Sequence, residues 1–230
     1  MANFSTHITV AAAGAGLLSV LCLQVGLVGS REALLLALLG TIGGILPDID
    51  LQHAYPSRIM FSLFGILVAF LLVFAKKSEL SIVELWGIGL TVFAVIRFPV
   101  WMVFHQYTTH RGSIHSLVAA LLFMFLTTAF AYHVMGEHPF MSWLFGLFVF
   151  LGFVLHLLLD ELYSVDFMNT RIKKSFGTAL KILDWKNRGK STLLVVATIL
   201  AWAVVPDSRS FWDTLLSAET YHIIGSRFLP

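Results

Sequence analysis

Charged side chains are scarce in this sequence of 230 residues, where Asp, Glu, Lys and Arg together make up only 12%. A soluble domain carries about 25% of such residues. Hydrophobic residues, in contrast, reach 58%. These proportions exclude an ordinary soluble domain and predict an integral membrane protein.

Cysteine and excess charge are also nearly absent. The single cysteine, Cys22, excludes an internal disulfide framework and a structural zinc site built from several thiolates. The net charge of +2 is too small to indicate a nucleic-acid substrate. No positively charged segment precedes the first apolar run, so we expect MANFSTHITV to begin a retained span rather than a cleaved signal peptide.

Apolar runs of about 17–25 residues are typical of transmembrane helices. They predict an all-α, polytopic transmembrane bundle of about seven spans, in which the short, Gly-rich second span is tilted or only partly crosses the membrane. We expect one transmembrane helical domain over 1–206, including a basic polar segment at 160–190, and a short tail over 207–230 with one amphipathic helix around 211–224. The expected spans are 8–29, 31–46, 58–75, 82–104, 113–135, 141–159 and 191–206.

The positive-inside rule predicts the orientation of this bundle. Segment 160–190 contains seven Lys and Arg residues, which places it in the cytoplasm. Counting spans from there puts nine of the fifteen Lys and Arg residues inside and five outside, with Arg97 within a span. The pair Lys76 and Lys77 argues for the opposite orientation.

Polar residues with metal-binding chemistry recur at the span ends that this topology brings to the cytoplasmic face. They open the first span, close the second, open the fifth within the stretch HRGSIHS (110–116), and close the sixth. These candidate metal ligands are His7, Asp48, Asp50, His110, His115, His156 and Asp160.

The spacing of these residues agrees with a shared site. His156 and Asp160 stand four apart, so they share one face of a helix. Gly112 predicts a break in HRGSIHS, with Ser113 as the helix N-cap and His115 in the first turn. Imidazole and carboxylate ligands without thiolates fit zinc, manganese or iron, and seven of them fit two or more bridged ions that activate water against phosphate esters.

Simpler interpretations exist for each motif by itself. A single His or Asp at a helix end is usually a cap or a solvated residue, and HRGSIH can serve as a basic loop that meets lipid phosphates. Arg97 can extend to the interface, pair with an acid or face a substrate phosphate. His53, His105 and Glu161 are additional ligand candidates, whereas the topology puts His133, His138 and His222 on the far face.

The order of the motifs resembles the YdjM-like family of membrane-bound, metal-dependent hydrolases. The resemblance rests on GILPDID (44–50), HRGSIHS (110–116) and HLLLD (156–160), after an initial span opened by a histidine. It implies a bacterial inner-membrane enzyme distantly similar to zinc-dependent phospholipase C and to nucleases of the P1 type, with the seven candidate ligands carried over by motif. The chain departs from the family pattern after PDID, where Leu51 stands in place of histidine and His53 follows two residues later.

These observations lead to the hypothesis of a metal-dependent hydrolase that cleaves a phosphoester of a membrane lipid or lipid-linked substrate. Asp48 or Asp50 would accept a proton, and Arg111 would offset phosphate charge. Two alternatives remain open. The same ligands can serve a divalent-metal transporter or sensor, and the basic segment can serve a non-catalytic membrane scaffold.

Overall fold

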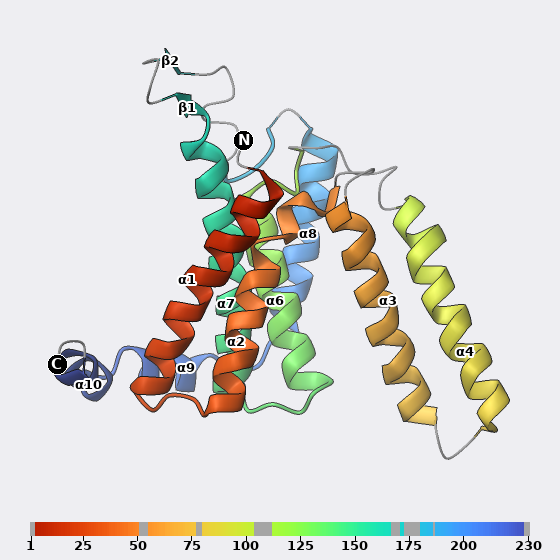
Figure 1. Ribbon diagram of the computed structural model, residues 1–230, viewed down its shortest axis with the longest axis horizontal. Coiled ribbons are helices and arrows are strands. Elements are labelled where there is room, and N and C mark those ends of the chain that lie inside the picture. The colour runs from red at the N-terminus through yellow and green to blue at the C-terminus, as the bar shows by residue number, and fades with distance from the viewer. Residues whose placement is uncertain are drawn as a thin grey trace. The chain divides into compact units, whose positions relative to one another are not determined.

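A computed structural model describes residues 3–50, 55–76, 80–103, 112–166, 171–172, 180–185 and 187–227, and it is helical nearly throughout (Figure 1). The chain forms two compact units. The larger comprises Met1–Pro47 and Arg111–Pro230, and the smaller comprises Asp48–His110. The all-α class predicted from the sequence is confirmed.

The described part of the larger unit contains seven α-helices, and local sequence signals fix where several of them begin. The side chain of Asn3 accepts a hydrogen bond from the amide of Thr6 and so caps the first helix. Pro139 occupies the first turn of α7, where its missing N–H costs nothing. The helices are α1 (Phe4–Gln24), α2 (Ser30–Gly43), α6 (Leu117–His133), α7 (Pro139–Leu162), α8 (Arg188–Ala203), α9 (Arg209–Leu215) and α10 (Ala218–Arg227).

Beside these α-helices, the structure has a pair of short strands and a 3-10 helix. Strands β1 (Val165–Asp166) and β2 (Arg171–Ile172) pair antiparallel just beyond the end of α7. The 3-10 helix η1 (Leu46–Asp50) follows α2. The tail was expected to hold one amphipathic helix around 211–224, but the structure has two helices there, α9 and α10.

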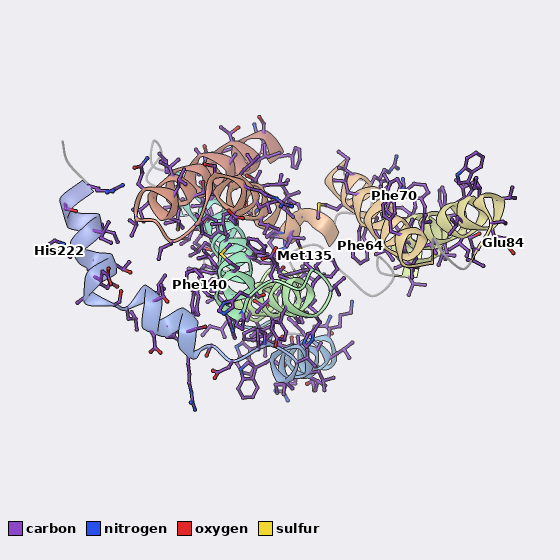
Figure 2. All side chains as sticks on the ribbon, turned by 90° about the horizontal axis from the view of Figure 1, so that it is seen from below. Phe64, Phe70, Glu84, Met135, Phe140 and His222 are labelled. Carbon is purple, nitrogen blue, oxygen red and sulfur yellow. The ribbon has the colours of Figure 1, made fainter. Side chains whose placement is uncertain are left out.

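The smaller unit is a hairpin of α3 (Tyr55–Lys76) and α4 (Ile82–Val95), the latter continued by a π-helical turn, η2 (Ile96–Val100). A capping box between Ser81 and Glu84 starts α4. The indole N–H of Trp101 donates to the hydroxyl of Ser57 at 3.0 Å, which ties the hairpin together at its open end. The hairpin exposes large apolar side chains, among them Phe64 and Phe70 of α3 (Figure 2), as lipid contact requires.

Arg97 lies within η2. Its guanidinium stands over two aromatic rings, 5.3 Å from the centroid of Phe98 and 5.7 Å from that of Trp101. Such contacts attract a cation to the face of a ring. Pro99 lies in the same turn and lacks an amide hydrogen, a feature that accompanies irregular helical geometry.

Five of the described helices are long and apolar enough to cross a membrane, and they match the first four and the sixth of the seven expected spans. The remaining two are not confirmed. Helix α6 is apolar but has 17 residues, about 26 Å at 1.5 Å per residue, and the hydrocarbon core is about 30 Å thick. Helix α8 is shorter still, at 16 residues.

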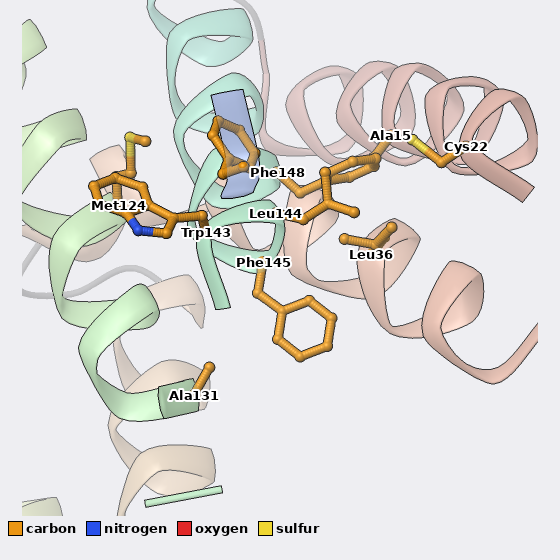
Figure 3. Close-up of a cluster of buried hydrophobic side chains, with 10 residues drawn as sticks. Ala15, Cys22, Leu36, Met124, Ala131, Trp143, Leu144, Phe145 and Phe148 are labelled. Carbon is orange, nitrogen blue, oxygen red and sulfur yellow. The ribbon is translucent and has the colours of Figure 1, made fainter. Parts of the chain in front are cut away.

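Helix α7 forms the centre of the larger unit. It packs against α1, α2, α6 and α9. In its most apolar stretch of 18 residues, 61% of the residues are buried, compared with 28% for α1. Figure 3 shows Leu144, Phe145 and Phe148 of α7 within the apolar cluster that also contains Leu36 of α2 and Met124 of α6. A polar side chain near the end of α7 is therefore held by a well-packed helix.

The backbones of α2 and α7 are in direct contact, and the glycines at this contact leave no room for a side chain. A Cβ on Gly152 of α7 would overlap the carbonyl oxygen of Gly40 and lie 2.9 Å from the amide nitrogen of Gly44. Small residues at helix interfaces permit this kind of backbone contact in membranes. The Gly-rich end of the second expected span is thus explained by close packing.

Candidate metal centre

The last two turns of α7 supply two of the predicted ligands. His156 and Asp160 are four residues apart and are 1% and 0% exposed. The structure places them on one face, with the His156 Nε2 atom 3.9 Å from Asp160 Oδ2. The geometry therefore agrees with the i, i+4 spacing read from HLLLD.

His7 joins these two residues from α1. It lies one turn after the Asn3 cap and is 3% exposed. Its Nε2 atom is 3.2 Å from Asp160 Oδ1, and its ring stacks on that of His156 with centroids 3.6 Å apart and planes 11° from parallel. Each of the three side chains offers a ligand atom within 4.8 Å of the other two, a spacing that fits one metal ion.

His115 approaches the same carboxylate from the start of α6. Its Nε2 atom is 3.9 Å from Asp160 Oδ2, and its fully buried ring meets that of His156 edge-on with centroids 5.7 Å apart. Asp160 thus faces three imidazoles that come from three separate segments. We call His7, His115, His156 and Asp160 the His/Asp cluster.

The stretch HRGSIHS adopts a different local structure from the one predicted. Ser116, and not Ser113, is the N-cap of α6, because it has extended backbone angles and its hydroxyl accepts from the amide of Ala119. His115 therefore lies just before the helix rather than in its first turn. The reason is a turn over 112–116, closed by the amide of His115 donating to the carbonyl of Gly112.

Contacts that sequence reasoning missed hold this turn in place. The amide of Leu117 donates to the carbonyl of Lys181 at 2.9 Å, and the hydroxyls of Ser113 and Ser191 are 3.4 Å apart. Ser191 is 2% exposed and donates to the carbonyl of Asp184, so it receives the proton of Ser113. No sequence signal marked these partners, because backbone carbonyls carry no residue signature.

A backbone carbonyl also orients His156. The Nδ1 atom of His156 is 2.7 Å from the carbonyl oxygen of Gly44, the C-cap residue of α2. A carbonyl only accepts, so Nδ1 carries the hydrogen and Nε2 holds the lone pair in the neutral ring. Metal-binding histidines are commonly oriented in this way. The close packing of α2 on α7 makes the bond available.

Of the other predicted ligands, Asp48 belongs to the smaller unit, Glu161 makes a separate contact, and the side chains of the rest are not described. Asp48 is buried and directly follows Pro47, at the residue where the smaller unit begins. Glu161 accepts from the amide of Leu180, an anchoring contact outside the cluster. The side chain of Asp50 lies outside the described structure, as do residues Leu51, His53, His105, His110 and Arg111.

Of the three histidines assigned to the far face, His133 and His138 lie at helix ends opposite to those that carry the cluster. His133 is the last of the 17 residues of α6, and its Nε2 atom contacts the carbonyl of Val204. His138 caps the start of α7, far along the helix from His156. His222 lies on α10 (Figure 2).

Burial sets the cluster apart in the described part of the chain. The buried polar side chains there are Ser and Thr residues apart from the four cluster members and Asp48. Burying ionisable groups is costly unless they pair or bind a metal, and such groups within membranes are functional by default. The imidazole nitrogens and carboxylate oxygens at one end of the bundle are suited to a divalent transition metal.

Comparison with known proteins agrees with this membrane architecture. Neither a curated protein nor a solved structure matches the chain. The family model described as YdjM inner membrane protein matches residues 1–205, a range that contains all four members of the His/Asp cluster. The family description and the five apolar helices together support a location in the inner membrane. The chain therefore belongs to the YdjM inner membrane protein family.

Proposed function

We propose that the protein is a membrane-embedded, metal-dependent hydrolase that cleaves a phosphoester of a lipid or lipid-linked substrate. The observation that carries this proposal is the buried His/Asp cluster, in which three imidazoles surround the Asp160 carboxylate. Such a concentration of ionisable groups in an apolar bundle needs a counter-charge or a metal, and the donor set is one that zinc, manganese and iron accept.

The donor atoms of the cluster fit a metal ion. His156 directs its Nε2 lone pair towards Asp160, because Nδ1 is engaged by the carbonyl of Gly44. The Nδ1 atom of His7 is buried and has no hydrogen-bond partner among the described residues, whereas its Nε2 atom faces the carboxylate. Both carboxylate oxygens of Asp160 face imidazoles, so this side chain could serve as a metal ligand together with the histidines.

Further ligands would extend the cluster to two or more ions. Asp48 is one of these by its sequence motif, GILPDID (44–50). The sequence adds Asp50 and His110 to the same proposal. Pairs of metal ions are common in enzymes that cleave phosphate esters.

The chemistry follows from these ligands. A bound divalent ion lowers the pKa of a water ligand and polarises phosphoryl oxygens. Asp48 or Asp50 accepts the proton of the attacking water, and Arg111 offsets the charge of the phosphate. The cluster lies within one or two turns of the ends of α1 and α7, at a depth that a lipid phosphate can reach from the leaflet. We place it on the cytoplasmic side from the distribution of basic residues.

A divalent-metal transporter or sensor is the strongest alternative. Transport requires polar groups through the bilayer and on both faces. In the described part of the larger unit, the buried His and Asp side chains are confined to one end. This confinement favours the hydrolase. A non-catalytic scaffold would not need buried ligands.

Metal content tests the site. We expect purified full-length protein to contain a divalent metal that His115→Ala, His156→Ala and Asp160→Ala each reduce. His133→Ala and His222→Ala are matched controls, because both side chains lie outside the cluster and should leave the metal content unchanged. Unchanged content by elemental analysis in all three cluster variants would contradict the proposal.

Metal-linked stability separates a metal site from a structural hydrogen-bond network. A metal that binds only the folded chain stabilises it by about 2.7 kcal/mol at 100 times its Kd. That corresponds to a Tm increase of about 5–11 °C for a chain of this size. We expect this increase when chelator-treated wild type is reloaded, and its absence in Asp160→Asn, which keeps the side-chain volume. A structural network would give equal Tm values with and without metal in both proteins.

Activity is tested separately. Purified protein in lipid should release phosphate or a phosphorylated headgroup from phospholipids or isoprenoid phosphates, and a chelator should abolish that release. No turnover on any of these substrates, together with divalent-ion flux into liposomes that contain the protein, would reject the hydrolase in favour of the transporter.

A further inference from the structure

A hollow of about 420 Å³ lies beside the start of α8, separate from the His/Asp cluster. Its walls come from residues 183–185 and from the first two turns of the helix. Trp185, Arg188 and Thr192 provide the polar and aromatic part of the lining, and Val195 and Val196 provide the apolar part. The hollow therefore has two chemically different ends.

Positive charge dominates the end near the start of α8. Asp184 also lines the hollow, but its carboxylate is 3.6 Å from the Lys181 ammonium, which offsets its charge. Arg188 is exposed and makes no ion pair among the described residues. A guanidinium of this kind binds phosphate oxygens through two parallel hydrogen bonds.

The other end continues onto a surface suited to lipid. Beyond Val196, which is 46% exposed, α8 exposes Ile199 at 56% and Leu200 at 64%. Trp185 is 75% exposed near the opposite end of this surface, and tryptophan is enriched at the boundary between headgroups and hydrocarbon. A molecule with an anionic head and an apolar chain matches both ends.

We propose that this hollow binds one anionic phospholipid of the surrounding bilayer. The phosphate contacts Arg188, and an acyl chain follows Val195 and Val196 along the exposed face of α8. Lipid binding here needs no metal and no hydrolysis, so the proposal stands apart from the proposed enzyme activity.

The hollow is connected to the cluster by hydrogen bonds. Ser191 lines the hollow, and its hydroxyl meets that of Ser113 in the turn that carries His115. The carbonyl of Lys181 meets the amide of Leu117 at the start of α6. A lipid bound in the hollow thus rests against the same residues that hold His115 in place.

Native mass spectrometry of the full-length protein tests the site, with phosphatidylglycerol and phosphatidylcholine as probes. We expect wild type to bind phosphatidylglycerol about tenfold more tightly than phosphatidylcholine, the scale of a charge-assisted contact. Arg188→Gln should abolish this preference. Arg209→Gln is the matched control, because Arg209 is an exposed arginine on α9 outside the hollow, and it should keep the preference.

A second variant tests the cavity itself. Val196→Trp fills the apolar end without changing charge and should weaken the binding of both lipids. A full preference for phosphatidylglycerol in Arg188→Gln, or unchanged binding in Val196→Trp, would overturn the proposal. Displacement of the lipid by millimolar inorganic phosphate would overturn it in favour of a free-anion site.

Chelator-treated wild type distinguishes this inference from the proposed function. We expect it to retain lipid binding, whereas any hydrolysis would be lost. Loss of lipid binding with the metal would show that the lipid binds at the cluster rather than in the hollow.

Discussion

Substitution of Gly152 by alanine should disturb the proposed metal centre although the residue offers no ligand. The added Cβ would overlap the carbonyl oxygen of Gly40 and lie 2.9 Å from the carbon of that carbonyl and from the amide nitrogen of Gly44. Ordinary contacts of this kind begin at 3.4 Å, so the two helices must separate by at least half an ångström. These neighbours are backbone atoms and cannot rotate away.

The expected cost follows from this overlap. Overpacking of a close-packed interior typically costs about 1–3 kcal/mol, which lowers Tm by about 2–12 °C for a chain of this size. The movement also lengthens the 2.7 Å bond between His156 and the carbonyl of Gly44. We therefore expect Gly152→Ala to lower both Tm and metal content, measured by intrinsic fluorescence and by elemental analysis.

Gly16→Ala provides the matched control for this experiment. Gly16 lies within α1, and a Cβ there would meet nothing within 4 Å. Alanine at such a helical position should be neutral or stabilising by up to about 1 kcal/mol. Equal Tm values and metal contents for Gly152→Ala and Gly16→Ala would refute the close approach of α2 to α7.

Two further predictions concern the topology and the loop before α6. A reporter fused after Arg188 should behave as cytoplasmic and one fused near Glu137 as external, and the opposite result from both would place the cluster on the outer face. Ser116→Ala removes the N-cap of α6 and should lower stability by about 1 kcal/mol. Ser62→Ala, which removes an exposed hydroxyl that only bonds back to its own helix, should have a smaller effect on Tm.

Helical spacing and span counting predicted the part of the site that depends on regular structure. His156 and Asp160 share a face because α7 is continuous from Pro139 to Leu162. His7 and His115 come to the same end because α1 starts there and α6 follows an even number of crossings later in the larger unit. These inferences need only the direction in which each helix crosses the membrane. That direction follows from the order of the apolar runs along the chain.

The exact helix boundary in HRGSIHS could not be predicted in the same way. Ser113 and Ser116 are both acceptable caps, and Ile114 between them is apolar, so local preference does not choose. The choice is made by the amide of Leu117, which bonds the carbonyl of Lys181 far along the chain. A contact of this separation has no local sequence signal.

Two of the seven expected spans are not confirmed, for a related reason. Apolar composition measures how well a segment tolerates lipid, but it does not measure helix length. The run around 113–135 is apolar throughout, yet the turn at 112–116 shortens the helix to Leu117–His133. The remaining length falls below the thickness of the hydrocarbon core. Its crossing of the membrane stays a prediction.

The two serines of HRGSIHS explain why so polar a stretch interrupts an apolar sequence. Ser116 caps α6 and also donates to the carbonyl of Ser113, while Ser113 contacts Ser191 of α8. His115 lies between these two anchored residues, so its ring faces Asp160 before any ligand arrives. A site whose ligands are held by surrounding hydrogen bonds loses little conformational freedom when an ion binds. The two serines therefore position the turn that carries His115, the residue between them that contacts Asp160.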